Sequence, residues 1–364
     1  MGRIIIENRS YSFEEIQAGK FNETDHYFTH ALHFCQSWLS NQQTFELQTS
    51  GSTGMPKNIQ IARSQMEISA KATRDYFQIR ENPSLLCCLN TWFIAGKMML
   101  VRGMEWKASI YLVTPSSKPF TSPNLQIPYD LVAMVPLQVE HCLNDEMGLS
   151  GLKQIKQLII GGAPSGDGLI NKLLDEKISA YQTYGMTETV SHIALAPIVD
   201  IDLTYEVLPG VIIGTDERGC LWLEAPMAKE HRIQTNDLIA LNSPTTFKWL
   251  GRADFTINTG GIKVQPELVE KAIEKLIYEI IGEVNFIIGG VPDESLGQKV
   301  ILIIEKDQLT LDKADFLKRL ASNLPKYHQP KEIHFLPEFV RTDTGKINRI
   351  RTLELLCSNL SSSS

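Results

Sequence analysis

A short segment rich in glycine and hydroxyl residues, at positions 48–57, has the composition of a phosphate-binding loop. It reads QTSGSTGMPK and directly follows a strand-like run at residues 45–47. Glycine lets the backbone approach an anion closely, the hydroxyls donate hydrogen bonds, and Lys57 adds a full positive charge. The segment differs from the common P-loop, because Pro56 and Asn58 stand where that motif has Gly and Ser or Thr. Taken alone, a flexible Ser/Gly surface loop remains an alternative interpretation.

Six further motifs follow this loop in order along the chain. They are GGAP at residues 161–164, YQTYGMTET at 181–189, TNDL at 235–238, GRAD at 251–254, TGGIKV at 259–264 and RTDTGKINR at 341–349. Together they resemble the motifs of the adenylate-forming superfamily, which includes acyl- and aryl-CoA ligases, peptide-synthetase adenylation domains and firefly luciferase. The resemblance extends from Thr49 to Arg349. It implies an enzyme that uses ATP to activate a carboxylate as an acyl-adenylate, releases pyrophosphate, and transfers the acyl group to CoA.

The resemblance implies a nucleotide site assembled from most of these motifs. Tyr184 would stack on adenine opposite the turn at residues 161–164, although a plain core aromatic is the alternative. Asp237 would accept hydrogen bonds from both ribose hydroxyls, because a carboxylate has two oxygens side by side. Arg252 would hold the ribose or a phosphate, and Asn236 stands where the family usually has glycine. The residues implied to bind ATP or CoA are Thr49, Ser50, Gly51, Ser52, Thr53, Gly54, Lys57, Gly162, Ala163, Pro164, Tyr184, Gly185, Asp237, Arg252, Gly260 and Gly261.

Three residues are implied to act on the reacting phosphate, and one to hold a metal ion. Adenylation crowds negative charge around phosphorus in its transition state, and fixed cations and donors lower the energy of that state. Lys57, Thr187 and Lys346 are implied in this role. Glu188 is the kind of single oxygen ligand that Mg²⁺ uses while it keeps waters and phosphate oxygens. For Lys346 and Glu188 alike, an ordinary exposed side chain is the alternative.

The second half-reaction needs a thiol in the place of Lys346, and the family brings it there by rotating a small domain. The resemblance puts the hinge at Asp254. It divides the chain into an adenylation domain (1–251), a hinge (252–254) and a small mobile domain (255–364). Gly260 and Gly261 would line the pantetheine tunnel, where absent side chains leave room. Only 48 residues precede Thr49, which is short for the superfamily, and a homodimer is one way to complete a shortened sheet.

The segment GMTETVSH at residues 185–192 most resembles the corresponding segment of the 2-succinylbenzoate–CoA ligases of menaquinone biosynthesis. In the pocket segment at residues 90–96, Phe93 replaces the histidine of the family pattern. A dianionic aryl acid needs a cation or several donors for the carboxylate that does not react. Lys97, Arg102 and Ser191 are the candidates, with an ordinary structural role as the alternative for each. The residues expected at the acid are Phe93, Lys97, Arg102, Met186, Ser191 and His192.

Hydrophobic periodicity predicts an α/β fold with a largely parallel sheet between residues 45 and 184. Short strands after Ala194 predict a small β-rich subdomain, and the residues beyond 254 predict a separate small α+β domain. The predicted strands are 85–89, 109–113, 131–135, 157–160, 178–184, 206–213, 220–224, 238–241, 284–289, 300–304 and 331–336. The predicted helices are 64–77, 96–102, 136–143, 168–175, 266–277 and 314–324.

Composition argues against several other classes of protein. The chain of 364 residues has 43% apolar and 21% charged residues, which is typical of a globular protein. A net charge of −7 argues against a nucleic-acid partner. No apolar stretch has membrane-spanning length and no signal peptide is recognisable, so we expect a cytoplasmic protein without a membrane partner. The six cysteines lack a C-x-x-C pair and are expected to be reduced and packed.

Three histidines, His26, His30 and His33, have the spacing of one helix face and could hold a metal ion. The apolar stripe opposite them favours instead an amphipathic helix with the histidines on its solvated face.

Other functions remain as alternatives. Another aryl or medium-chain acid, or a carrier protein in place of CoA, would fit the same motifs. A non-catalytic nucleotide-binding relative is a different class, against which the joint presence of all the charged motif residues argues. A P-loop NTPase is disfavoured by Pro56 and Asn58.

Overall fold

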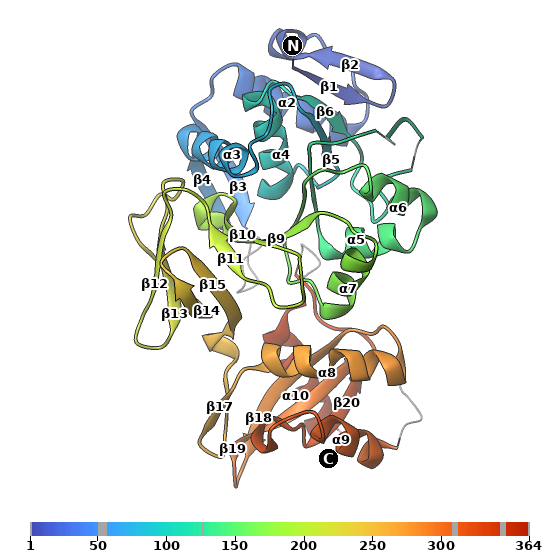
Figure 1. The fold of residues 1–364 in the computed structure, drawn as a ribbon, viewed down its shortest axis with the longest axis vertical. Helices are drawn as coiled ribbons and strands as arrows, with labels where there is room; N and C mark the ends of the chain where they lie inside the picture. Colours follow the sequence, from blue (N-terminus) through green and yellow to red (C-terminus); the bar gives the residue numbers. More distant parts are fainter. Residues whose placement is uncertain are drawn as a thin grey trace.

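The chain forms two units that follow one another along the long axis of the molecule (Figure 1). The computed structural model describes residues 2–49, 57–121, 123–125, 127–307, 312–342 and 347–362. Side chains are described for these residues except 47–49, 57, 58, 123, 361 and 362. The N-terminus lies at the far end of the upper unit and α10 (Arg349–Ser362) lies in the lower one.

One sheet runs through the whole upper unit. From edge to edge its strands are β12 (Ile212–Thr215), β13 (Cys220–Glu224), β14 (Ile233–Ser243), β15 (Thr246–Arg252), β11 (Tyr205–Val207), β10 (His192–Pro197), β9 (Ala180–Gly185), β8 (Leu158–Ile160), β7 (Leu131–Met134), β5 (Ser84–Cys87), β6 (Ser109–Leu112), β1 (Arg3–Ile6) and β2 (Arg9–Ser12). The helices of this unit are α1 (Phe13–Gln17), α2 (His26–Leu39), α3 (Arg63–Phe77), α4 (Ile94–Glu105), α5 (Pro136–Leu143), α6 (Glu146–Leu152) and α7 (Asp167–Asp175).

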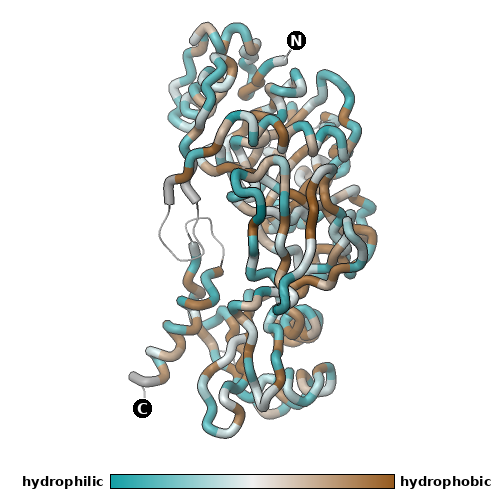
Figure 2. Tube along the Cα trace, turned by 90° about the vertical axis from the view of Figure 1, so that its left-hand side faces the viewer, coloured by the Kyte–Doolittle hydropathy of each residue, from teal (hydrophilic) through white to brown (hydrophobic). Residues whose placement is uncertain are grey.

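The six strands from β9 to β1 are parallel, and both faces of this part of the sheet are covered. Leu85 and Cys87 of β5 pack into one core cluster with α2, α3 and α4, whereas Leu86 packs into a second cluster with α5 and α7. Successive strand residues therefore pack into cores on opposite faces of the sheet, which explains the unbroken apolar runs of these strands. In Figure 2 stretches of hydrophobic residues are visible along the trace of the upper unit.

The predicted α/β class with a mainly parallel sheet is confirmed. Most predicted elements of this region are present, with ends shifted by one to three residues, and α5 has the predicted bounds. The antiparallel strands predicted as a β-rich subdomain continue the same sheet, because β10 pairs with β9 and β11 with β15. The single strand predicted at 206–213 is wrong: it is two strands separated by a turn, where Gly210 adopts φ +84°.

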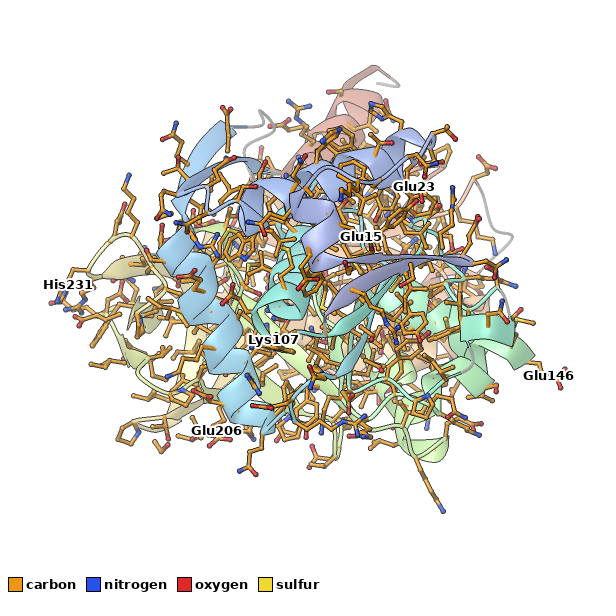
Figure 3. All side chains as sticks on the ribbon, turned by 90° about the horizontal axis from the view of Figure 1, so that it is seen from above. Glu15, Glu23, Lys107, Glu146, Glu206 and His231 are labelled. Carbon is orange, nitrogen blue, oxygen red and sulfur yellow. The ribbon has the colours of Figure 1, made fainter. Side chains whose placement is uncertain are left out.

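The chain completes the sheet with its own N-terminal residues. Strand β1 pairs in parallel with β6, and β2 turns back antiparallel to β1. Tyr11 of β2 donates a hydrogen bond to the buried carboxylate of Glu23 at 2.8 Å. Figure 3, seen from above, shows Glu15 and Glu23 on this N-terminal segment and His231 at the left edge of the view. Strand β2 is the edge strand at this end of the sheet, and the predicted homodimer stays a prediction.

The lower unit is an α+β layer with its own core. It contains β16 (Ile257–Thr259), β17 (Ile262–Val264), α8 (Pro266–Ile281), β18 (Phe286–Asp293), β19 (Gly297–Glu305), α9 (Lys313–Ala321), β20 (Glu332–Leu336) and α10. Val269, Ile273 and Ile277 follow the helical period along α8 and pack against buried residues of β18 and β19. All residues of this cluster come from the lower unit.

The two units meet where α8 lies against the start of α7 (Figure 1). Glu274 of α8 accepts hydrogen bonds from the backbone N–H groups of Asp167, at 2.7 Å, and Gly168, at 3.3 Å. The N-cap residue of α7 is Gly166, which has no side chain to do this. A Cβ atom on Gly166 would lie 2.2 Å from the Glu274 carboxylate, so the lower unit supplies the cap of a helix in the upper one.

Other predictions from composition can be compared with the described residues. Five cysteines are buried, whereas Cys357 is exposed, contrary to the prediction that all are packed. His26 and His33 are exposed as predicted, but His30 is partly buried and stacks on Trp92 with ring centroids 3.4 Å apart. In the part of the chain described, no cluster of three or more potential metal ligands occurs, and no helix is long and apolar enough to cross a membrane.

Candidate nucleotide and acid site

The predicted adenine turn is held in place by a buried glutamine of β9. Gln182 accepts hydrogen bonds from the backbone N–H and hydroxyl of Ser165, at 3.1 and 2.6 Å. Its amide donates to the carbonyl oxygens of Ile160 and Ala163, at 3.2 and 3.0 Å. Gly162 in this turn has φ +88°. One side chain thus satisfies several polar groups of the turn and fixes it beside β9, where Tyr184 lies two residues further along.

Three polar side chains approach the carboxylate of Asp237 near the end of β9. The Tyr184 hydroxyl donates to it at 2.6 Å, and the Trp249 indole donates at 3.4 Å. Asp237 and Arg252 are cross-strand partners in β14 and β15, and a guanidinium nitrogen of Arg252 lies 3.8 Å from the carboxylate. Burial and the neighbouring Asp237 raise the pKa of Tyr184. The structure therefore brings Tyr184, Asp237 and Arg252 together, as predicted.

Arg252 also connects this site to the predicted hinge. It forms an ion pair with Asp254 at 2.6 Å, within the short helical turn η3 (Ala253–Phe255) that leads into the lower unit. Burial opposes the charged form of Arg252, yet the Asp254 hydrogen bond and the two acidic neighbours raise its pKa. Its Nε atom is buried without a hydrogen-bond partner among the described residues. An anionic or hydroxyl-bearing ligand would satisfy that nitrogen.

The Thr187–Thr189 turn, η2, leaves β9 and ends in a strained residue. Glu188 is exposed and Thr187 is partly buried. Val190 has φ +66° and ψ −47°, and the N–H of Ser191 reaches the carbonyl of Thr189 at 2.6 Å. This is a γ-turn of the rare form, which a β-branched residue adopts only when its surroundings hold it there. The turn reverses the chain, so that Glu188 and Ser191 lie on either side of it.

The acid-side candidates come from α4 and from the segment before it. Gly96 is required near the start of α4, because a Cβ atom there would lie 2.4 Å from the carbonyl oxygen of Asn90. Phe93 is the N-cap residue and is partly buried. Lys97 is buried, donates to the carbonyl of Trp92 at 3.2 Å and lies over the Phe34 ring. Burial lowers the pKa of Lys97.

Arg102, further along α4, is a buried cation without an acidic partner among the described residues. Its side chain is 2% exposed. One guanidinium nitrogen donates to Ser191 at 2.8 Å and another lies 3.8 Å from the Met99 sulfur, while Nε has no partner. Burial lowers the pKa of Arg102 to about 10, so it remains charged at neutral pH. A buried charge without a counter-charge is costly, which indicates that an anionic ligand belongs beside it.

The predicted acid-side residues do not all lie together. Arg102, Ser191 and His192 lie together, since Ser191 contacts both of the others. Lys97 is directed to Trp92 and Phe34 instead, and no described contact joins it to Arg102. Met186 packs against the core cluster that contains α2 and α4.

Several predicted residues lie outside the described part of the structure. These are Ser50, Gly51, Ser52, Thr53, Gly54 and Lys346, and the side chains of Thr49 and Lys57. Thr49 and Lys57 are cross-strand partners at the ends of the antiparallel pair β3 (Thr44–Thr49) and β4 (Lys57–Ala62). A P-loop joins a strand to a helix, so this antiparallel pair excludes the P-loop alternative.

Gly260 and Gly261 are not brought to the nucleotide residues. They form the tight turn between β16 and β17, with φ +56° and +80°. Gly260 donates its N–H to the carbonyl of Leu296 at 2.9 Å, and a Cβ atom on it would lie 2.7 Å from the Tyr327 ring; both residues are in the lower unit. Figure 1 shows β17 at the side of the lower unit away from β9. A pantetheine role for this turn therefore requires the lower unit to move.

The sequence interpretation missed three side chains that hold the site together, namely Gln182, Trp249 and Thr73. Gln182 is 2% exposed in β9. A long amide side chain at a buried strand position needs hydrogen-bond partners, and this was a signal that the sequence offered. Trp249 and Thr73 contact Asp237 and His192 across more than ten residues of sequence, and no local pattern marks them.

Replacing Asp237 with alanine is expected to raise the KM for ATP by about 10- to 100-fold, because hydrogen bonds to a charged group contribute about 1.5–3 kcal/mol. The measurement is the ATP dependence of pyrophosphate release. Tyr184→Phe is the matched control, because it keeps the ring and removes one donor to the same carboxylate. It should change this KM less than Asp237→Ala does. An unchanged KM for ATP in Asp237→Ala would remove the residue from the nucleotide site.

Comparison with known proteins agrees with this geometry. The model of the AMP-binding enzyme family matches residues 15–214, which is more than half of the chain. The chain therefore belongs to the AMP-binding enzyme family. The predicted resemblance to adenylate-forming enzymes, and the predicted class of AMP-forming acid–thiol ligase, are confirmed at this level.

Three proteins with names that include an acyl-CoA or acid–CoA ligase are similar to this chain. One similar structure is the crystal structure of an acyl-CoA synthetase (AMP-forming)/AMP-acid ligase II-like protein from Dyadobacter fermentans. Its sequence is 34% identical to this one, the match covers 93% of this chain and 97% of that chain, and the TM-score is 0.63. The 2-succinylbenzoate–CoA ligase of Bacillus cereus is 24% identical over 95% of this chain and 75% of its own length. O-succinylbenzoate CoA synthetase from Bacillus subtilis, solved with ATP and magnesium ion, shares the fold, with 20% identity, 84% and 69% coverage and a TM-score of 0.69.

Proposed function

We propose that this chain is a 2-succinylbenzoate–CoA ligase. It would activate the acid with ATP to give an acyl-adenylate and pyrophosphate, and then transfer the acyl group to the thiol of CoA, giving the CoA thioester and AMP. The names of the curated relatives support the substrate. A structure of the Bacillus subtilis enzyme with an acyl-adenylate supports the same sequence of steps.

The single observation that carries the proposal is the buried guanidinium of Arg102. An acid with one carboxylate uses that carboxylate for adenylation and has no second anion to pair with Arg102. A dicarboxylate brings a second anion that Arg102 can pair with in a site removed from water, where such a pair is strong. Ser191 would add a hydroxyl donor or acceptor beside it. Medium-chain acids offer Arg102 no such partner.

Each of the other site residues would have a separate role in adenylation. Asp237 would fix the ribose and Tyr184 the adenine, with Gln182 holding the turn on the other side. Arg252 would present positive charge to the nucleotide while Asp254 orients it. In-line attack on the α-phosphate requires the acid to be held in a fixed position. Arg102, which contacts Ser191 after η2, would hold it. Lys57, Thr187 and Lys346 would offset the charge that develops on phosphorus.

Mg²⁺ fits the donor set at this site. Glu188 is a single exposed carboxylate, and this cation commonly binds through one or two carboxylates plus waters and substrate phosphates. When bound, the ion supplies positive charge to the phosphate oxygens of ATP. Glu188 would hold it, and Val190 would keep Glu188 at a fixed distance from Ser191 along the chain.

We further propose that residues 255–364 move as a unit about Asp254 between the two half-reactions. The arrangement in the structure would serve adenylation, because the described contacts of Gly260 are within the lower unit and not with the nucleotide residues. The hydrogen bonds from α7 to Glu274 would stabilise this arrangement. They would have to break before the thiol step, because they join the two units.

Replacing Glu274 with alanine is expected to weaken the adenylation arrangement by about 1 kcal/mol, the typical effect of losing a helix cap. The rate of adenylation should fall about five-fold, and thioester formation from supplied acyl-adenylate should not fall. Single-turnover measurements of each half-reaction test this. Glu283→Gln is the control, since its ion pair with Lys172 also joins the units but is exposed and contributes little. Equal losses in both half-reactions would contradict the capping role.

The proposed substrate is tested by exchange of labelled pyrophosphate into ATP without CoA. 2-Succinylbenzoate, benzoate, 4-coumarate and octanoate are supplied separately. We expect strong exchange with 2-succinylbenzoate alone. Exchange with another acid would keep the adenylation chemistry and overturn the substrate. No exchange with any acid, in folded protein that binds ATP, would favour the non-catalytic alternative. Addition of CoA and then of a phosphopantetheinylated carrier protein identifies the thiol acceptor.

A further inference from the structure

A continuous line of hydrogen-bonding groups runs from Arg102 into the protein interior. Arg102 donates to the Ser191 hydroxyl at 2.8 Å, and that oxygen lies 3.5 Å from Nδ1 of His192. Nε2 of the same imidazole lies 3.1 Å from the hydroxyl of Thr73 on α3. Thr73 in turn donates to the backbone carbonyl of Ser69 at 3.0 Å. His192 and Thr73 are buried, so water does not substitute for these partners.

The hydrogen bond from Thr73 to Ser69 sets the directions that we assign to the other bonds in this line. The carbonyl of Ser69 can only accept, so the single hydroxyl hydrogen of Thr73 is used there. The contact between Thr73 and His192 then requires Nε2 of the imidazole to carry its hydrogen. A neutral imidazole has one such hydrogen, which leaves Nδ1 as an acceptor for the Ser191 hydroxyl. Burial and the nearby Arg102 lower the pKa of His192 well below its ordinary value, consistent with the neutral ring.

We propose that His192 and Thr73 are positioning residues for the acid, which orient Ser191 so that its oxygen accepts from Arg102 and the guanidinium is held for the second carboxylate. This inference rests on the proposed function and extends it from the residues that touch the substrate to those behind them. With its hydrogen committed to His192, Ser191 presents a lone pair to Arg102. Two residues that do not face the ligand thereby decide where the guanidinium points.

The geometry explains why His192 is separate from the substrate itself. Both ring nitrogens are committed to protein groups, one on each side of the ring. His192 therefore has no nitrogen left for the acid and acts only through Ser191. The sequence prediction that His192 contacts the substrate becomes, on this proposal, a role in positioning.

The test compares Thr73→Val with Thr73→Ser. Valine has nearly the shape of threonine but cannot accept the hydrogen of His192, whereas serine keeps the hydroxyl. Pyrophosphate release is measured with 2-succinylbenzoate and with two analogues that each lack one carboxylate, 4-oxo-4-phenylbutanoate and 2-butanoylbenzoate. We expect Thr73→Val to raise the KM for the dicarboxylate about 10-fold with kcat less affected. The kinetics of whichever monocarboxylate reacts should be unchanged, and Thr73→Ser should behave as the wild type.

A spectroscopic measurement keeps this inference separate from the identity of the substrate. Nitrogen–proton correlation spectra of histidine-labelled protein report the tautomer of His192, assigned by its loss in His192→Gln. We expect the Nε2–H form in wild type and in Thr73→Ser, and a different form in Thr73→Val. An Nδ1–H or doubly protonated ring in wild type would overturn the inference even if the proposed substrate is correct.

Equal kinetic losses for mono- and dicarboxylates in Thr73→Val would mean that these hydrogen bonds have only a structural role. If wild type does not prefer the dicarboxylate, the proposed function fails while the tautomer result still decides the hydrogen-bond line.

Discussion

Replacing Arg102 with methionine should make the protein more stable and nearly inactive toward 2-succinylbenzoate. The guanidinium is 2% exposed and has no acidic partner among the described residues, so the free protein bears the cost of a buried charge. Methionine has a similar length and no charge. We expect the free energy of unfolding to rise by about 1–3 kcal/mol, as when buried charges are replaced by well-packed apolar residues. The value of kcat/KM for the dicarboxylate should fall about 10²- to 10³-fold, because its second carboxylate loses a buried charged partner.

Denaturant unfolding and steady-state kinetics measure the two effects separately. Arg351→Met removes an exposed arginine and should change neither quantity appreciably. Ligand stabilisation provides a further comparison, because 2-succinylbenzoate should raise the melting temperature of wild type more than that of Arg102→Met. If Arg102→Met lowers stability and affects mono- and dicarboxylates alike, Arg102 is a structural residue and the argument for a dicarboxylate fails.

Replacing Lys346 with alanine should abolish one half-reaction and spare the other. Formation of the acyl-adenylate is expected to fall about 10²- to 10³-fold, the typical effect of losing one group that stabilises transition-state charge. Thioester formation from supplied acyl-adenylate should change little, because the small domain is then expected in its other orientation. Lys346 lies outside the described residues, and this prediction comes from its place in the RTDTGKINR motif.

Rapid-quench measurement of each half-reaction tests this assignment. Lys318→Ala, which removes an exposed lysine from α9 of the same unit, should affect neither step. A loss of similar size in both half-reactions would mean that Lys346 does not act specifically in adenylation.

Local pattern was sufficient for the elements that carry strong periodicity. The apolar run at Leu85–Cys87 could only be a covered strand, and the Pro136 start of α5 gave its first residue. Pattern failed where pairing depends on distant residues. The strand β1 has an apolar run of three residues, but only its pairing with β6 more than a hundred residues later makes it part of the sheet. The subdomain strands looked separate because no local signal shows that β10 continues from β9.

The site was predictable as far as motifs reach. Tyr184, Asp237 and Arg252 were expected together and lie together. Lys97 and Arg102 looked equivalent in sequence, since both are cations on one helix. The structure distinguishes them, because five residues of helix turn the two side chains to different surroundings and only Arg102 reaches Ser191. The supporting residues Trp249 and Thr73 could not be predicted, because their roles exist only through contacts made in the fold.

The γ-turn at Val190 has a consequence for any effort to change the acid that this protein accepts. Glu188 and Ser191 are joined through Thr189 and the strained Val190, so a library of variants at residues 187–192 would disturb the proposed metal ligand together with the proposed acid contact. Helix α4 meets that segment through the hydrogen bond from Arg102 to Ser191. Directed evolution toward a new acid should therefore vary α4 and leave the turn intact, because α4 can exchange side chains without moving the groups that handle ATP.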